Sequence, residues 1–167
     1  MKRILSAILV VALMLGLSVC VFGEYSYGAK EVTVNVNGET YKLLGYEVPG
    51  GDVGVKVRDI AYLFNGTSKQ FNVYFQEGYV HVVTGQPYAP IGIELQQYTG
   101  TEVKGAYSHH IFMLDGNYSG VEATLAADYN YVPLAYFSAL LGAMPIFNED
   151  GSIKIDTDYV LDDSDWG

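Results

Sequence analysis

The chain has 167 residues, and nine Lys and Arg against nineteen Asp and Glu give it a formal net charge of −10. This length fits one domain or two very small ones. A surface this acidic repels nucleic acid and anionic lipid, and no basic stripe offsets it, so nucleic-acid binding is excluded.

The N-terminus has the tripartite form of a secretory signal peptide. Met1-Lys2-Arg3 supplies positive charge, and an uncharged apolar run extends from Ile4 to Phe22. Small residues place cleavage after Gly28 or after Gly23, with Gly28 preferred, so we expect residues 1–28 to be removed and the protein to be secreted or held at the cell surface. An uncleaved anchor is an alternative, because the run approaches the about 20 residues that span a bilayer.

Cys20 is the single cysteine, and a lipoprotein in which it is lipidated is a further alternative. If Cys20 leaves with the signal, the mature chain has no thiol, disulfide or cysteine metal site. Residues 24–167 hold seven basic and nineteen acidic residues, a net charge of −12.

The first half is predicted to contain two hairpins with a short helix between them. Asn37-Gly38 is a strong hairpin signal, and Asn65-Gly66 tolerates the left-handed conformation of a helix end. The period of the apolar residues changes at Val55, which favours a helix from that point. The predicted elements are strands over 32–36 and 39–44, a turn over 49–52, a helix over 55–64, and strands over 71–75 and 79–83.

The second half is predicted to repeat this order after an extended linker at 86–90 and a less regular stretch to Gly105. Asp115-Gly116 again indicates a hairpin, Pro133 lies where a helix would begin, and Gly142 would end it. The predicted elements are a hairpin strand over 111–114, a segment over 121–125, a loop over 126–130, a helix over 134–141, and hairpin strands over 144–147 and 153–155.

Offsets of 76 to 78 residues relate the hairpin, helix and glycine signals of the two halves, which indicates an internal repeat. We therefore expect a β-rich α+β fold of two repeated units of antiparallel hairpins, each with one short helix. The expected boundaries are a signal peptide over 1–28, units over 29–97 and 98–160, and a solvated acidic tail over 161–167.

The order of these motifs resembles the copper amine oxidase N-terminal-like family, often called the stalk domain. The resemblance rests on a V-N-G hairpin, V-K-V-R-D-I-A, N-G-T-S-K-Q-F-N-V, and Y-V-P-L with L-L-G-A, and it covers about residues 32–155. It implies an extracellular or wall-associated accessory module, and does not imply amine oxidation. The family's Arg-Asp pair is present as Arg58-Asp59 but is replaced by Ala135-Tyr136 in the second unit.

Arg58 is the only arginine of the mature chain, and its simplest role is an ion pair or carbonyl contact that holds the helix. With Asp59 it belongs to the expected structural motif. The motif residues are Arg58, Asp59, Asn65, Gly66, Pro133 and Gly142.

No catalytic pattern is found, and neither a metal nor a cofactor is expected. His109 and His110 would point to opposite faces of a strand, and His81 lies on another strand, so the three do not suit one metal. Nucleophile elbows and phosphate-binding glycine loops are absent. The chain is therefore predicted not to be an enzyme. A secreted glycan-acting enzyme with a carboxylate pair stays as the alternative, because nineteen acids leave that choice open.

Two features suggest ligands. Fifteen tyrosines follow residue 23, and exposed tyrosines could stack on sugar rings or form a protein interface, although tyrosine also favours strands. The candidate contacts are Tyr79, Tyr88, Tyr107, Tyr129 and Tyr131. The acidic stretch over 149–165 could bind a divalent ion weakly through Asp156, Asp158, Asp162 and Asp163, but solubility explains it more simply.

The sequence thus predicts a non-catalytic, secreted or cell-surface stalk or binding module. Its partner would be wall polysaccharide or a surface protein. Pairing of exposed strand edges between copies is a further alternative.

Overall fold

The computed structural model describes residues 25–48, 52–96 and 102–159 as a β-rich α+β fold with two sheets and two short helices. Residues 1–24 of the predicted signal peptide, the glycines of the 49–52 turn, Tyr98 and the acidic tail over 161–167 lie outside the described residues.

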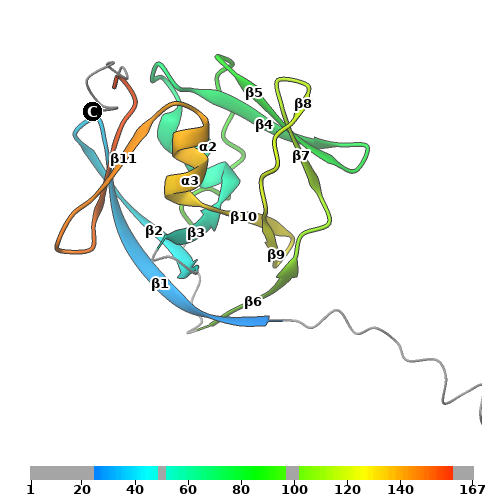
Figure 1. Ribbon diagram of the computed structural model, residues 1–167, viewed down its shortest axis with the longest axis horizontal. Coiled ribbons are helices and arrows are strands. Elements are labelled where there is room, and N and C mark those ends of the chain that lie inside the picture. The colour runs from blue at the N-terminus through cyan, green and yellow to red at the C-terminus, as the bar shows by residue number, and fades with distance from the viewer. Residues whose placement is uncertain (1–24, 49–51, 97–101, 160–167) are drawn as a thin grey trace, which may run out of the picture.

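The larger sheet has the strand order β11-β12-β1-β2-β3-β10-β9-β6, and β6 also pairs with β1. Six strands therefore close into a ring, β1-β2-β3-β10-β9-β6, with the β11–β12 hairpin added to the outer part of β1 (Figure 1). The bounds are β1 Tyr25–Val36, β2 Glu39–Glu47, β3 Val53–Lys56, β6 Glu102–Tyr107, β9 Thr124–Ala126, β10 Tyr129–Pro133, β11 Met144–Phe147 and β12 Ile153–Asp156.

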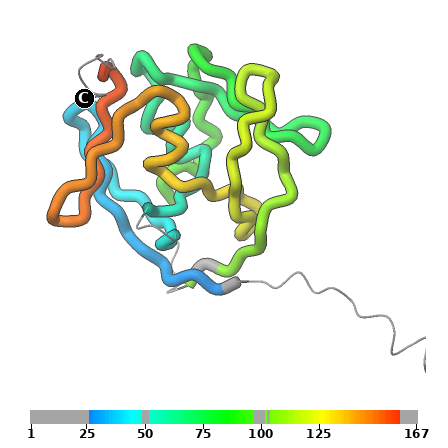
Figure 2. Tube along the Cα trace, viewed as in Figure 1, coloured from blue at the N-terminus to red at the C-terminus, as the bar shows by residue number. Residues whose placement is uncertain are grey.

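Strand β1 is long because it pairs with three partners. Residues 25–28 pair antiparallel with β6, residues 29–36 pair antiparallel with β2, and residues 34–36 pair parallel with β12. In Figure 2 the blue strand can be followed from the closure of the ring to the orange β11–β12 hairpin.

The smaller sheet has the order β4-β5-β7-β8. It combines the second hairpin of the first half with the first hairpin of the second half, because β5 and β7 pair in parallel. Its strands are β4 Phe71–Gln76, β5 Tyr79–Thr84, β7 Ile111–Leu114 and β8 Asn117–Tyr118.

Helices α2 (Val57–Phe64) and α3 (Leu134–Leu140) follow β3 and β10, which pair antiparallel at the centre of the molecule. Each helix turns one apolar face inward, including Ile60 and Phe64 of α2 and Leu134 and Phe137 of α3. One core cluster joins both halves, from Val32 to Ile155, so the two predicted units share a single core.

The turns of the β1–β2, β4–β5, β7–β8 and β11–β12 hairpins lie where they were predicted, but β1 begins at Tyr25 rather than at Val32. Three other predictions were wrong in whole or in part. Val55 lies in β3, and the helix begins only at Val57, because these apolar residues pair with β10 before the chain turns. The predicted loop over 126–130 is the β9–β10 hairpin. The irregular stretch predicted up to Gly105 ends earlier, because β6 begins at Glu102 and pairs with β1 and β9.

Smaller differences concern the helix ends. Pro133 is the last residue of β10 and the N-cap of α3, and α3 ends at Leu140, one residue earlier than predicted. Gly66 and Gly142 both follow helices with positive φ, at +80° and +76°, as their predicted role at helix ends requires.

Candidate ligand-binding surfaces

The Arg58-Asp59 motif lies at the start of α2, where it holds the segment over residues 88–95. Asp59 is only 1% exposed, and its carboxylate lies 3.2 Å from the Lys56 ammonium and accepts a hydrogen bond of 3.0 Å from the Leu95 N–H. Burial raises the pKa of Asp59, although Lys56 and the Leu95 N–H act in the opposite direction. Lys56 also donates to the Ile93 carbonyl at 3.0 Å.

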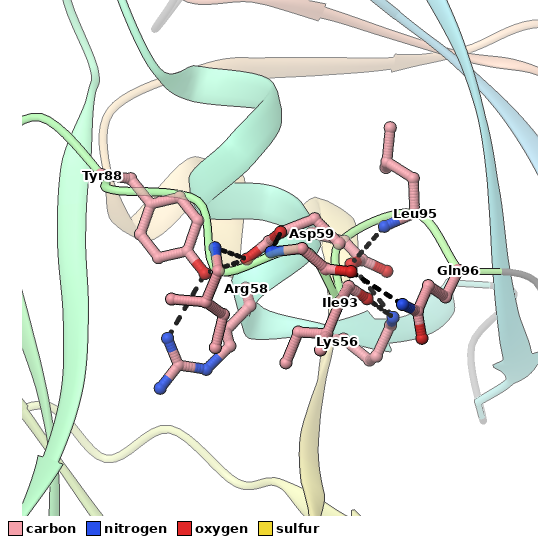
Figure 3. Close-up of polar contacts among 10 residues, drawn as sticks. Lys56, Arg58, Asp59, Tyr88, Ile93, Leu95 and Gln96 are labelled. Carbon is pink, nitrogen blue, oxygen red and sulfur yellow. Dashed lines mark hydrogen bonds and ion pairs between the residues drawn. The ribbon is translucent and has the colours of Figure 1, made fainter.

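Arg58 contacts the same segment through Tyr88 (Figure 3). Its guanidinium donates to the Tyr88 hydroxyl at 3.3 Å, and that hydroxyl donates to Glu94 at 2.5 Å. Glu94 also accepts the N–H groups of Ile91 and Gly92. Partial burial raises the pKa of Glu94, but these hydrogen bonds outweigh it and lower the pKa to about 2.

Asn65 completes this anchor from the other end of α2. Its side-chain amide donates to the Tyr88 carbonyl and accepts from the Tyr88 N–H, both at 3.0 Å. The motif residues of α2 therefore act as structural contacts to the connecting segment, although Arg58 contacts a tyrosine hydroxyl rather than the carboxylate or carbonyl expected for it.

The five candidate tyrosines do not form one surface. Tyr88 and Tyr131 are only 3% and 6% exposed, so neither can offer a ring face to a ligand. Tyr129 is half-buried beneath the Lys56 ammonium, 5.3 Å from its ring centre. Tyr79 and Tyr107 are exposed, but they lie on different sheets.

Tyr79 belongs to the outer side of the smaller sheet, which we call the aromatic face (Tyr74, Tyr79, His81, Ile111, Met113 and Tyr118). The pairing register places Tyr74, His81, Met113 and Tyr118 opposite one another in a row across all four strands. Tyr79 and Ile111 form the next row. Phe71, Val73, Val80, Val82 and Phe112 point to the opposite side and are buried.

The tyrosines and Ile111 of the aromatic face are exposed, whereas His81 and Met113 are half-buried. Tyr74 stacks on His81 with ring centres 4.9 Å apart and an interplanar angle of 11°, and Tyr118 is 75% exposed. No Lys, Arg, Asp or Glu occupies the described outward positions, which are Asn72, Tyr74, Gln76, Tyr79, His81, Val83, Ile111, Met113 and Tyr118.

Tyr107 belongs to a separate cavity at one end of the ring, which we call the tyrosine pocket (Tyr27, Tyr46, Tyr107, Tyr136, Asp52 and Glu122). Its volume is about 440 Å³. Tyr46 is buried and stacks on Tyr27 with ring centres 4.5 Å apart. Burial raises the pKa of the Tyr46 phenol to about 12, against a hydrogen bond with Thr124, so this hydroxyl stays neutral.

The two carboxylates of the tyrosine pocket differ in their contacts. Asp52 accepts hydrogen bonds from the N–H groups of Ala135 and Tyr136, at 3.0 and 3.2 Å, and from that of Val53. It therefore caps α3 from outside the helix. Among the described residues, no hydrogen bond or ion pair engages the Glu122 carboxylate.

A smaller cavity of about 280 Å³ lies beside α2 and includes Lys56, Arg58, Phe75, His110 and Asp128 in its lining. Within the described part of the chain Arg58 forms no salt bridge, so its charge faces this cavity with only the Tyr88 hydroxyl as partner.

The histidines take part in ring contacts. His109 and His110 precede β7 rather than lying within a strand, and their ring centres are 4.5 Å apart, so the predicted alternation of faces was wrong. His110 also contacts Asn130, with 3.2 Å between Nδ1 and Oδ1. No group of three His, Cys, Asp or Glu that could hold a metal occurs among the described residues.

Sequence reasoning missed most of both surfaces. Alternation over 71–76 and 79–84 is a usable signal, because it assigns Tyr74 and His81 to the side opposite Val73 and Val82. No local signal could assemble the tyrosine pocket, since Tyr27, Tyr46, Tyr107 and Tyr136 come from β1, β2, β6 and α3.

Comparison with known proteins finds no matching family model, curated protein or solved structure. In the described part of the chain, neither helix is long and apolar enough to cross a membrane.

Proposed function

We propose that this protein is an exported, non-catalytic stalk-type module that binds a neutral wall polysaccharide through its aromatic face. The observation that carries the proposal is the uncharged row of Tyr74, His81, Met113 and Tyr118 across four paired strands. A sugar ring has an apolar C–H side and polar edges, and tyrosine combines an apolar ring with a hydroxyl that stays in water.

Charge favours a neutral polymer over an anionic one. The chain carries a net charge of −10, so nucleic acids and acidic polymers are repelled over the whole surface. Because the aromatic face itself lacks charged residues, a neutral glycan loses no ion hydration when it binds there.

The alternative of a glycan-acting enzyme receives less support. Asp52 and Glu122 line one pocket, which is the arrangement that a carboxylate pair would need. The Asp52 carboxylate, however, is occupied by backbone N–H groups at the start of α3. A group held in this way is a poor nucleophile or proton carrier.

Export and the family relation are parts of the same proposal. The order of hairpin, strand, helix and hairpin in β1–β5 recurs in β7–β12 with β9 inserted, which supports two repeated units of the stalk-domain type. Residues 25–28 pair with β6, and the Tyr27 ring stacks on Tyr46. Cleavage after Gly23 would preserve these contacts, so we now favour Gly23 over Gly28.

The test is co-sedimentation of residues 24–167 with isolated cell-wall material, with calcium and with chelator. We expect retention that survives moderate salt, because the interaction is uncharged. Tyr118→Ala and Tyr79→Ala should each reduce retention several-fold while changing the free energy of unfolding by about 0.5 kcal/mol or less. Tyr136→Ala, which removes an exposed tyrosine from the other surface, is the matched control.

Loss of retention in Tyr136→Ala but not in Tyr118→Ala would move the binding site to the tyrosine pocket. Protein that stays in the supernatant under all conditions would contradict wall binding. Retention only with calcium would assign it to acidic groups such as Asp156 and Asp158 instead. Release of reducing sugar from the wall would favour the enzyme alternative.

A further inference from the structure

We propose that the tyrosine pocket binds an organic cation, a quaternary or N-methylated ammonium group. The pocket lies on the ring of strands, whereas the aromatic face belongs to the smaller sheet, so this inference does not depend on the proposed glycan binding. Its volume of about 440 Å³ lies within the range of about 300–1,000 Å³ for small-molecule sites.

Four tyrosines are part of the pocket lining. Tyr46 is 2% exposed, whereas Tyr107 and Tyr136 are 65% and 52% exposed and keep accessible surface in the same cavity. Tyr27 is the third ring with accessible surface, and the buried Tyr46 ring stacks against it and holds it in place without facing a ligand itself. The face of an aromatic ring carries partial negative charge, and several rings around one cavity are the arrangement that recognises quaternary ammonium ions.

The pocket also carries negative charge, from two carboxylates. Asp52 and Glu122 both line the pocket, and its lining includes no Lys, Arg or His from the part of the chain that the structure describes. Glu122 has no partner among the described residues, so its charge remains available to a cation. Asp52 keeps its charge in a fixed position because backbone N–H groups hold it.

The type of cation follows from the hydrogen-bonding groups. A primary ammonium such as that of lysine is strongly hydrated and needs several acceptors when it leaves water. The strongest acceptors of the lining are partly engaged, because Asp52 already accepts backbone N–H groups and Tyr46 is buried, while Val48, Ala123 and Pro133 add apolar surface. A methylated ammonium has no or few N–H donors and loses less hydration there, so the pocket favours it.

The cavity beside α2 provides an internal contrast. It also has aromatic lining, from Phe75 and Tyr129, but Lys56 and Arg58 are part of it and would repel a cation. Between the two cavities, only the tyrosine pocket combines rings with acidic and without basic side chains.

The experiment is isothermal titration of residues 24–167 with choline chloride and with 3,3-dimethyl-1-butanol, a neutral compound of nearly the same shape. We expect choline to bind at least tenfold more tightly than the neutral compound, because only the cation is attracted by the rings and carboxylates. Tyr107→Leu, Tyr136→Leu and Glu122→Gln should each weaken choline binding, by about tenfold for either tyrosine. Tyr118→Leu is the control and should bind choline like the unchanged protein.

Equal affinity for both compounds, or choline binding that survives both tyrosine substitutions, would overturn the proposal, as would absence of choline binding by a folded protein. Far-UV circular dichroism of each variant confirms folding. Phosphatidylcholine vesicles then distinguish the source of the cation: protein that pellets with them recognises a lipid headgroup. Protein that binds choline but stays in the supernatant recognises a free amine.

Discussion

Glu94 fixes the turn over residues 91–92, because its carboxylate accepts two backbone N–H groups and the Tyr88 hydroxyl. The motif residues of α2 converge on the same segment, Arg58 through Tyr88 and Asp59 through Leu95. Sequence analysis assigned Arg58 and Asp59 to a structural motif but treated Tyr88 as a ligand contact. Tyr88 is buried because it contacts α2, whose Arg58 lies 30 positions away in the chain. No local sequence pattern reveals such a contact.

This geometry predicts a loss of stability in acid. The pKa of Glu94 is near 4.5 in the unfolded chain and about 2 in the folded protein, so ionised Glu94 stabilises the fold above pH 4.5. That contribution is lost as the pH falls from 4.5 towards 2. Between pH 4.5 and 2, the free energy of unfolding of Glu94→Gln should decrease less than that of the unchanged protein. Urea denaturation at several pH values measures this difference.

Asp59 affects the pH dependence of stability in the opposite direction. Because burial raises its pKa, its contribution to the free energy of unfolding grows as the pH falls. It is present in both proteins, so the difference between them isolates Glu94. Identical pH profiles for the two proteins would contradict the assigned role of Glu94.

At the scale of elements, the helices depend on residues outside them. Neither α2 nor α3 receives a cap from its own N-cap side chain, and Asp52 supplies the acceptor for α3 across a separation of 83 residues. Pro133 and Gly142 allowed the position of α3 to be predicted from the sequence. Nothing in the sequence predicted its contact with Asp52. Local signals locate such helices, whereas tertiary contacts hold them.

Removing the Asp52 cap should therefore weaken α3. We expect Asp52→Ala to lower the free energy of unfolding by about 1–2 kcal/mol, since two backbone N–H groups of α3 lose their acceptor. Asp52→Asn keeps one acceptor oxygen and should lose less. Urea denaturation at pH 7 measures both, and an equal loss in the two variants would assign the effect to charge rather than to hydrogen bonding.

The strands of the ring approach closely at β2 and β3, and glycines make this possible. A Cβ atom at Gly45 would lie 2.0 Å from the Gly54 carbonyl oxygen, and one at Gly54 would meet the Tyr46 ring at 2.5 Å. Strand β2 was predicted only in part and β3 was not predicted, because the sequence does not indicate how near two backbones come.

Gly45→Ala should thus be strongly destabilising, by about 3 kcal/mol or more, because backbone atoms rather than a flexible side chain must move. Gly28→Ala is the matched control in β1, where a new Cβ would meet nothing within 4 Å. Thermal unfolding of the two variants compares them. A stable Gly45→Ala protein would show that β2 and β3 are further apart.

At the scale of the molecule, the two halves are interlaced. The first hairpin pairs with the last through β1 and β12, the two inner hairpins pair through β5 and β7, and β3 pairs with β10. Each half therefore leaves its strand edges and apolar faces uncovered without the other. The segments over 29–97 and 98–160, which were expected to be two units, contribute residues to one core.

Fragments 24–97 and 98–167 should consequently be largely unfolded alone, and should regain β structure when mixed. Far-UV circular dichroism and size-exclusion chromatography follow this change. The intact chain over 24–167 is the reference for native signal and elution. A fragment that folds cooperatively by itself would contradict the shared core.

Local patterns in the sequence determined four of the hairpin turns, the approximate positions of both helices and their glycine ends, because turn dipeptides and apolar periods act over a few residues. Tertiary structure alone decided that β6 and β1 close a ring, that Tyr88 and Tyr131 are buried, and that four tyrosines meet in one pocket. The burial of Tyr88 depends on α2, about 30 positions away, and the ring depends on pairing between more distant segments, such as Tyr27 with Val103. Such pairing leaves no periodic trace in either segment.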